Sequence, residues 1–166
     1  MAKKLSSNID YFEGYKLLGI ASQLKDYSLV FFINQNLDID LKKYEDMDIT
    51  DNEGGESAFS WYFYKDEHLE SKIYLISNSS ASGKLFPSKK EMDYFMLLKD
   101  YPNEENYASR IIPEIRKIQN VLGVFNFDLN NIKNADLFIE NVELQEIKYI
   151  KRPKTKFKKT TGRIKE

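Results

Sequence analysis

The chain has 166 residues and a net charge of −1 at pH 7, with 42% hydrophobic and 14% aromatic residues. This composition excludes a disordered protein and a fibrous one, and the length fits one globular domain. The absence of cysteine excludes disulfides, thiol nucleophiles and thiolate metal ligands, and it favours a reducing compartment. The longest apolar run covers only residues 29–33, so we expect no signal peptide, no membrane span and a cytoplasmic location.

The first half of the chain predicts a strand, a helix and a hairpin. Residues 11–22 combine aromatic and aliphatic side chains with two glycines, which favours a strand with a bend or bulge. The apolar spacing in residues 24–36 favours a helix, although residues 29–33 alone would also suit a buried strand. Side chains alternate between two faces in residues 57–66, and a charged turn leads to an apolar run at 70–78, which is typical of a β-hairpin.

The second half predicts a strand, a helix and another strand. Residues 92–99 are mostly apolar, residues 103–118 place apolar side chains three and four positions apart, and residues 121–127 are again apolar. This order fits a right-handed crossover in which the second strand returns beside the first and parallel to it. Pro113 is expected to kink or split the helix. Residues 136–144 form a candidate edge strand.

Together these elements predict an α+β fold with a mixed, largely antiparallel sheet, two helices packed on one face and a basic C-terminal tail. We expect a single domain at residues 1–146. Residues 147–166 form the predicted tail, where the apolar content falls and Pro153 lies among lysines. We expect this tail to be disordered when it is free.

Opposite charges are separated along the chain. Residues 1–146 contain 16 lysines and arginines against 25 aspartates and glutamates, whereas residues 147–166 contain nine against one. Cations interleaved with aromatic rings neutralise phosphates and stack on bases, so this segment is a candidate nucleic-acid-binding segment. Its candidate binding residues are Lys148, Tyr149, Lys151, Arg152, Lys154, Lys156, Phe157, Lys158, Lys159, Arg163 and Lys165.

We therefore expect a non-enzymatic binding protein whose basic tail engages RNA or a ribonucleoprotein surface. The same charges would also suit an acidic protein partner, a membrane surface, a merely solubilising tail, or a tail folded back onto the acidic residues 38–56. Two alternatives belong to other classes of function. One is a protein-interaction adaptor that uses exposed aromatic residues, and the other is a small carboxylate-dependent enzyme.

The sequence contains no motif that fixes a reaction, and we expect no catalytic residue, cofactor or metal ligand. The single histidine, His68, falls in a predicted exposed turn, and residues 78–84 lack the first glycine of a phosphate-binding loop. The acidic residues 38–56 lack the order of a calcium loop, so they predict a solvated loop, with a divalent-ion site as the alternative. Tyr62 and Tyr64 would suit a stacking platform for RNA, but packing under a helix or loop is the expected role.

One landmark is the tripeptide Ile112-Pro113-Glu114. With it, a similar length and an aromatic-rich N-terminal half, the chain resembles the small bacterial IPExxxVDY family over residues 8–145. The positions that correspond to Val-Asp-Tyr hold Ile118-Gln119-Asn120, so only the first is conservatively kept. The resemblance implies no activity, cofactor or catalytic residue. The tripeptide itself predicts a kink and a charge near the start of the following turn, which is a structural role.

Overall fold

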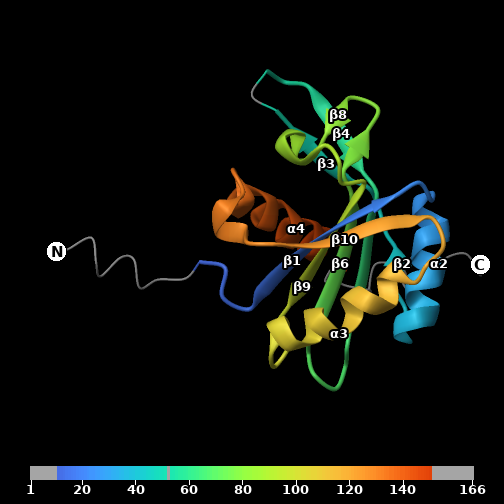
Figure 1. The fold of residues 1–166 in the computed structure, drawn as a ribbon. Coiled ribbons are helices and arrows are strands. Elements are labelled where there is room, and N and C mark those ends of the chain that lie inside the picture. The colour runs from blue at the N-terminus through green and yellow to red at the C-terminus, as the bar shows by residue number, and fades with distance from the viewer. Residues whose placement is uncertain (1–10, 52, 151–166) are drawn as a thin grey trace, which may run out of the picture.

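The computed structural model describes residues 11–51 and 53–150, and a six-stranded sheet lies at its centre (Figure 1). The strand order is β10-β1-β9-β6-β5-β2, and every neighbouring pair is antiparallel. The strands are β1 Tyr15–Ser22, β2 Lys42–Lys43, β5 Trp61–Lys65, β6 Lys72–Ser77, β9 Tyr94–Lys99 and β10 Val121–Phe127. Two small ribbons project beyond one end of this sheet. They pair β3 Met47–Thr50 with β4 Glu56–Phe59 and β7 Ser79–Ser80 with β8 Gly83–Lys84.

Helices cover both faces of the sheet (Figure 1). α2 Asp26–Leu37 and α3 Glu104–Arg116 lie on one face, and α4 Ala135–Tyr149 lies on the other. Short 3-10 turns occur at η1 Pro87–Lys89 and η2 Leu129–Asn131. Among the described residues, no helix is long and apolar enough to cross a membrane.

Local sequence explains where α3 begins. The Asn103 side chain accepts a hydrogen bond from the Asn106 N–H, and two glutamates follow in the first turn, where negative charge favours the helix dipole. α3 continues through Pro113 without a break, so the expected split does not occur. Glu114 lies in the last turn rather than near a helix start, and it forms an ion pair with Lys117 at 3.1 Å.

The α+β class, the largely antiparallel sheet and the helices expected at 24–36 and 103–118 are confirmed. The predicted hairpin is also present, but its first strand divides at Ser60. β4, before this residue, joins the ribbon with β3, and β5, after it, joins the main sheet.

The predicted edge strand at 136–144 is wrong, because these residues lie in α4. A third helix therefore packs on the sheet face that was expected to be bare. The reason is the mixed polarity of α4. Phe138, Ile139 and Val142 are buried at helical spacing. Gln145 and Glu146 are buried too, whereas Leu137 and Leu144 are each 54% exposed. These polar inner and apolar outer residues weaken the hydrophobic periodicity that marks a helix.

The crossover from β9 through α3 to β10 is present, but its strands are not neighbours. β1 lies between them and pairs antiparallel with both, with Leu18 opposite Met96 on one side and Asn126 on the other. β9 and β10 therefore run in the same direction with a third strand inserted. Periodicity along 92–127 contains no information about this distant strand.

Two hydrophobic layers follow from the alternation of side chains along the strands. Leu18 and Ile20 of β1 face α2 and α3, where they pack with Ile33 and Ile115. Leu17, one position away, faces α4 in a layer whose other members include Trp61, Phe95, Phe138 and Val142. Each face of the sheet thus has its own core.

Both edges of the sheet are poor templates for a further strand. β2 is two residues long and consists of exposed lysines. In β10 the register with β1 shifts after Ala21, which indicates a bulge, and the Arg116 guanidinium donates a hydrogen bond of 2.7 Å to the Val124 carbonyl. Val124 lies opposite Ile20 of β1, and the Ile20 carbonyl accepts a hydrogen bond from the Asp93 N–H on the β9 side. Since the backbone groups of Ile20 point toward β9, those of Val124 point away from β1, outward from the sheet. Arg116 therefore covers an edge acceptor.

Candidate functional site

Most residues predicted to bind nucleic acid lie outside the described part of the chain. Lys148 and Tyr149 are described, and they form the last turn of α4, with the Lys148 Nζ 5.8 Å from the Tyr149 ring centroid. The helix thus passes the expected domain boundary after Glu146. The remaining predicted binding residues are Lys151, Arg152, Lys154, Lys156, Phe157, Lys158, Lys159, Arg163 and Lys165, all outside the described residues.

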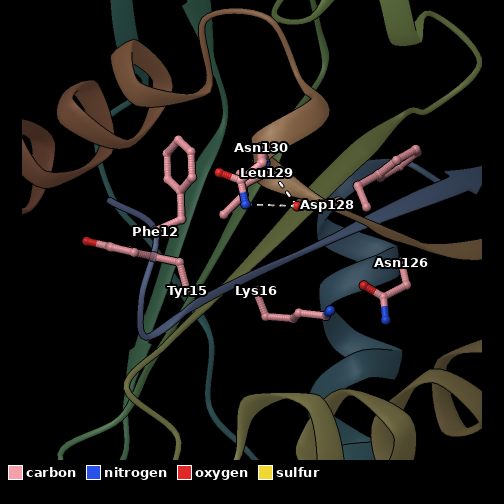
Figure 2. A pocket seen from close by; sticks show the side chains of 8 residues that line it. Phe12, Tyr15, Lys16, Asn126, Asp128, Leu129 and Asn130 are labelled. Atoms are coloured by element: carbon pink, nitrogen blue, oxygen red, sulfur yellow. Dashed lines mark hydrogen bonds between the residues drawn. The ribbon is translucent and has the colours of Figure 1, made fainter. Parts of the chain in front are cut away.

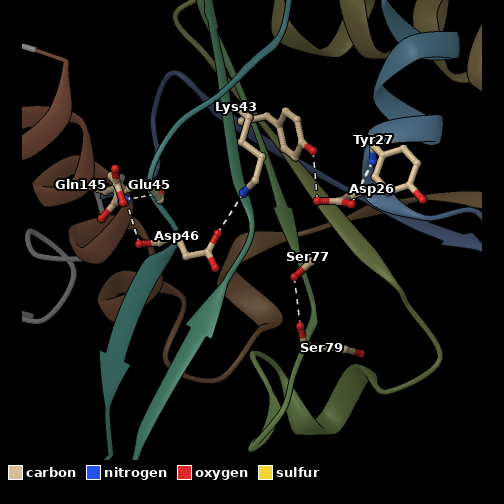
Figure 3. Close-up of polar contacts among 9 residues, drawn as sticks. Asp26, Tyr27, Lys43, Glu45, Asp46, Ser77, Ser79 and Gln145 are labelled. Carbon is tan, nitrogen blue, oxygen red and sulfur yellow. Dashed lines mark hydrogen bonds and ion pairs between the residues drawn. The ribbon is translucent and has the colours of Figure 1, made fainter.

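The tyrosines of β5 do not form a stacking platform for RNA. Tyr62 is buried under α2, and its hydroxyl donates a hydrogen bond of 3.0 Å to Asp26 (Figure 3). Burial and the Asp26 carboxylate raise the pKa of Tyr62. Tyr64 is half-buried against the same core. Tyr62 therefore packs in the core, as expected, and Tyr64 packs partly against the same core.

A pocket of about 380 Å³ is lined by three tyrosines at one end of the sheet. We call it the tyrosine pocket. Its residues come from the end of α2, the β5–β6 turn and the start of α3, which meet only in the folded chain. They are Leu37, Asp38, Ile39, Tyr64, Asp66, Leu69, Tyr101, Pro102, Asn103, Asn106, Tyr107 and Arg110.

The tyrosine rings of this pocket are ordered by stacking. Tyr101 and Tyr107 lie face to face, with ring centroids 4.0 Å apart and an interplanar angle of 7°. The Arg110 guanidinium lies over the Tyr107 ring, 5.3 Å from its centroid. Tyr101 is buried and Tyr107 is half-buried, so the stacked pair forms a fixed wall. The pocket therefore already holds one cation against an aromatic face.

Two carboxylates complete the pocket. Asp38 ends α2 in the left-handed conformation, with φ 57°, so the chain turns sharply toward the sheet there. Asp66 opens the β5–β6 turn, and one of its oxygens accepts the N–H groups of His68 and Leu69 at 2.9 and 3.0 Å. His68 itself is exposed in this turn, as the sequence predicts. Two aspartates and one arginine give the lining a net negative charge.

This environment disfavours further negative charge. Burial is the main cause that raises the pKa of Tyr64, Tyr101 and Tyr107, and the Asp66 carboxylate raises all three further. Arg110 acts in the opposite direction on Tyr107, but the pKa of that phenol is still raised. The three hydroxyls are therefore neutral at physiological pH and can accept hydrogen bonds from a cation.

A second pocket, of about 480 Å³, opens where β10 separates from β1 (Figure 2). Phe12, Tyr15 and Lys16 line one side, and Asn126 and the residues that follow line the other. Its charged groups have structural partners. Lys16 forms an ion pair of 2.6 Å with Glu105 on α3, and Asp128 caps η2.

Two carboxylates, one buried and one half-buried, hold α4 against the sheet. Glu146, 3% exposed, accepts a hydrogen bond of 2.6 Å from the Tyr74 hydroxyl and forms an ion pair of 2.7 Å with Lys72. One turn earlier, Glu143 accepts from the Tyr15 hydroxyl and pairs with Lys99 at 3.2 Å. Each of the two carboxylates thus contacts one lysine and one tyrosine hydroxyl, and these contacts position α4 on the sheet.

The acidic residues 38–56 form short strands and turns rather than an ion site. Lys43 pairs with Asp46 at 2.9 Å, and Gln145 of α4 donates to the carbonyls of Glu45 and Asp46 (Figure 3). Asp51 accepts the Gly55 N–H at 2.7 Å. Across residues 11–51 and 53–150, no group of three or more acidic or histidine side chains could hold a metal ion.

The outer side of α2 is unusually aromatic. Tyr27 is 66% exposed, Phe31 61% and Phe32 38%, and the two phenylalanine rings meet edge to face at 5.2 Å. We call these three residues the α2 aromatic face. No charged residue occurs between Asp26, the first residue of α2, and Asp38, so the helix carries no charge after its first position.

No protein-family model and no curated protein matches the chain. The resemblance to the IPExxxVDY family, which rests on residues 112–114, therefore stays a prediction. In the fold this tripeptide joins α3 to α2, because the Glu114 carbonyl accepts a hydrogen bond of 3.0 Å from the Asn36 side chain.

The tyrosine pocket was missed at the level of sequence. Its lining residues come from segments separated by up to about 70 positions, and no short motif connects them. The only local signal was the pair Tyr101-Pro102 immediately before the Asn103 cap, which marks an aromatic residue held at the start of a helix. Such a signal indicates a boundary, and the pocket depends on tertiary contacts.

Proposed function

We propose that the protein is a non-enzymatic binding protein whose basic C-terminal segment engages RNA or a ribonucleoprotein surface. The observation that carries this proposal is the separation of charge. Residues 1–150 contain 17 lysines and arginines against 25 acids, whereas residues 151–166 contain eight against one. The absence of cysteine supports a cytoplasmic location for this activity.

The ion pairs of the folded body support the same proposal. Seven lysines of the body are within 4.0 Å of a carboxylate, so their charge is already balanced by the protein. They are Lys16, Lys42, Lys43, Lys65, Lys72, Lys99 and Lys117. Phosphate contacts are therefore best supplied by residues 151–166, and the acidic body would repel a nucleic acid that approached it directly.

The test compares the full chain with a neutral-tail variant, in which every lysine and arginine of residues 151–166 is replaced by glutamine. Binding of a generic single-stranded RNA is measured at several salt concentrations. If about five tail cations contact phosphates, the slope of log affinity against log salt is about −3.5. The neutral-tail variant should lose this slope and most of the affinity.

A matched control removes four cations from the body instead, through Lys84→Gln, Lys89→Gln, Lys90→Gln and Lys133→Gln in one variant. This variant should bind RNA with nearly the salt slope of the full chain. Equal RNA affinity for the neutral-tail variant and the full chain would contradict the proposal. If both bind RNA weakly but only the full chain binds a polyglutamate peptide, an acidic protein partner replaces RNA.

A second candidate, a protein-interaction adaptor, is favoured by the α2 aromatic face. Three exposed rings lie on a helix that has no charge after Asp26, and this surface is more apolar than folding requires. We propose a second copy of this chain as the partner of this face. An uncharged patch meets itself across a two-fold axis without like-charge repulsion, which matters for a body with excess negative charge.

Sedimentation at increasing protein concentration tests this second proposal. The full chain should show a reversible dimer, and Phe31→Ser with Phe32→Ser should abolish it. Leu137→Ser, which removes an equally exposed apolar residue from α4, is the matched control and should leave the dimer intact. A chain that stays monomeric at all concentrations rules out self-association through α2.

A further inference from the structure

The tyrosine pocket combines the three features that recognise an organic cation. It has aromatic rings, neutral hydroxyl and amide oxygens, and an excess of carboxylates over cations. Its volume of about 380 Å³ suits a small ligand or the end of a long side chain. Neither the carboxylates nor the rings would attract an anion to this place.

Arg110 shows what the pocket accommodates. Its guanidinium lies 5.3 Å from the Tyr107 ring centroid, while the other face of that ring is stacked on Tyr101 at 4.0 Å. Arg110 is an exposed residue on α3, so its side chain can leave the ring at little cost. A ligand cation that enters the pocket would share the ring and the carboxylates with this internal guanidinium.

The two aspartates belong to turns of different parts of the chain. The Asp38 backbone is fixed by the left-handed end of α2, where its N–H donates to the Asn34 carbonyl. The Asp66 carboxylate is fixed by the two N–H groups that it accepts in the β5–β6 turn. A carboxylate held like that of Asp66 needs little reordering when a cation arrives, which favours binding.

We propose that the tyrosine pocket binds an alkylguanidinium or alkylammonium group. Asp38 and Asp66 supply the charge, and Tyr64 and Tyr107 supply rings and hydroxyl acceptors. Tyr101, whose hydroxyl is buried, supports the Tyr107 ring by stacking on it. The cation belongs either to a separate molecule or to the basic segment at residues 151–166 of the same chain. This site is distinct from the proposed RNA contacts, so either proposal can fail without the other.

The first experiment titrates the full chain with N-acetylarginine amide and follows backbone amide signals by NMR. N-acetylcitrulline amide, which has the same shape without the charge, is the matched probe. Shifts should be confined to residues that line the pocket, and the citrulline probe should bind at least about tenfold more weakly. Equal binding of the two probes, or shifts centred elsewhere, would overturn the proposal.

Three substitutions in the full chain sharpen the result. Asp38→Asn and Asp66→Asn should each weaken binding of the arginine probe about tenfold, because a charge-assisted contact becomes neutral. Asp66→Asn keeps an oxygen for the turn, so the fold is preserved. Arg110→Ala should strengthen binding about threefold, because the internal competitor is removed. Weaker binding of the arginine probe after Arg110→Ala would show that Arg110 helps to form the site instead of competing for it, and would contradict the proposal.

The neutral-tail variant distinguishes the two sources of the cation. If the segment 151–166 fills the pocket, this variant should bind the arginine probe more tightly than the full chain, because tethered cations compete at high effective concentration. Equal affinity assigns the site to a separate molecule. A third result is that the arginine probe causes no shifts at the pocket residues of the neutral-tail variant while the other amide signals of that variant are unchanged. This result would overturn the proposal that the pocket itself is the site.

Discussion

The two faces of the sheet are stabilised in different ways. On the face that carries α2 and α3, apolar side chains such as Ile33 and Ile115 fill the space between helices and sheet. On the other face, the first half of α4 packs through Phe138 and Val142, but its second half is held by buried polar side chains. The first face depends on how well volumes fit, and the second depends on whether each polar group keeps its partner.

The difference predicts two kinds of sensitivity to mutation. A cavity on the α2–α3 face costs energy in proportion to the volume removed, and neighbouring side chains can relax into it. A missing partner at the end of α4 leaves a buried charge or hydroxyl, for which no relaxation compensates well. The predictions below compare these faces, from the largest expected effect to the smallest.

Ile115→Ala removes a fully buried side chain from the α2–α3 face. We expect the free energy of unfolding to fall by about 4 kcal/mol, within the range for such truncations. Urea denaturation followed by circular dichroism measures this change. A loss below about 1 kcal/mol would show that volume does not control this face.

Lys72→Met removes the cation that faces Glu146 while keeping most of the side-chain volume. We expect a loss of about 3 kcal/mol, because the buried carboxylate loses its charged partner. Combining this change with Glu146→Gln removes the buried charge but keeps an acceptor for the Tyr74 hydroxyl, and it should recover part of the loss. Additive losses in the double variant would argue against coupling between the two residues.

Tyr74→Phe removes one hydroxyl from the same contact and should cost about 2 kcal/mol at pH 7. Burial first, and then the hydrogen bond to Glu146, raise the pKa of Tyr74 above its ordinary value of 10. Above about pH 10 the unfolded state loses the phenol proton while the folded state keeps it, so this group's stabilisation falls as pH rises. Urea titrations between pH 9 and pH 11 should show a shallower loss for Tyr74→Phe than for the unsubstituted chain.

Leu137→Ser changes the outer surface of α4, where the side chain is 54% exposed. We expect a change within about 0.5 kcal/mol. A much larger loss would show that another part of the chain covers this surface, and the contrast between the inner and outer sides of α4 would then need revision.

The same contrast explains which elements the sequence could predict. α3 was foreseen because Ile111 and Ile115 repeat at helical spacing behind an Asn103 cap. The alternating aromatic residues of β5 pointed to a strand, and Tyr62 lies in a core as expected. In these elements apolar residues face inward, which is the assumption behind every reading of periodicity.

The second half of α4 fails this assumption, and the helix was mistaken for a strand. Its inner side carries Gln145 and Glu146. Gln145 donates to the carbonyls of Glu45 and Asp46, and Glu146 is held by Lys72 and Tyr74 of β6. Sequence alone does not show that these partners will be near. The insertion of β1 between β9 and β10 and the assembly of the tyrosine pocket were missed for the same reason, since both join segments that are distant in the chain.

The bulged β10 edge also bears on behaviour in a crowded cell. Strand β10, with the sequence VLGVFNF, has no charge, and Phe125 is 45% exposed. Such a segment would recruit further chains into a growing fibril if its backbone were free. Because Arg116 occupies the Val124 carbonyl, this edge offers one backbone acceptor fewer to such a chain.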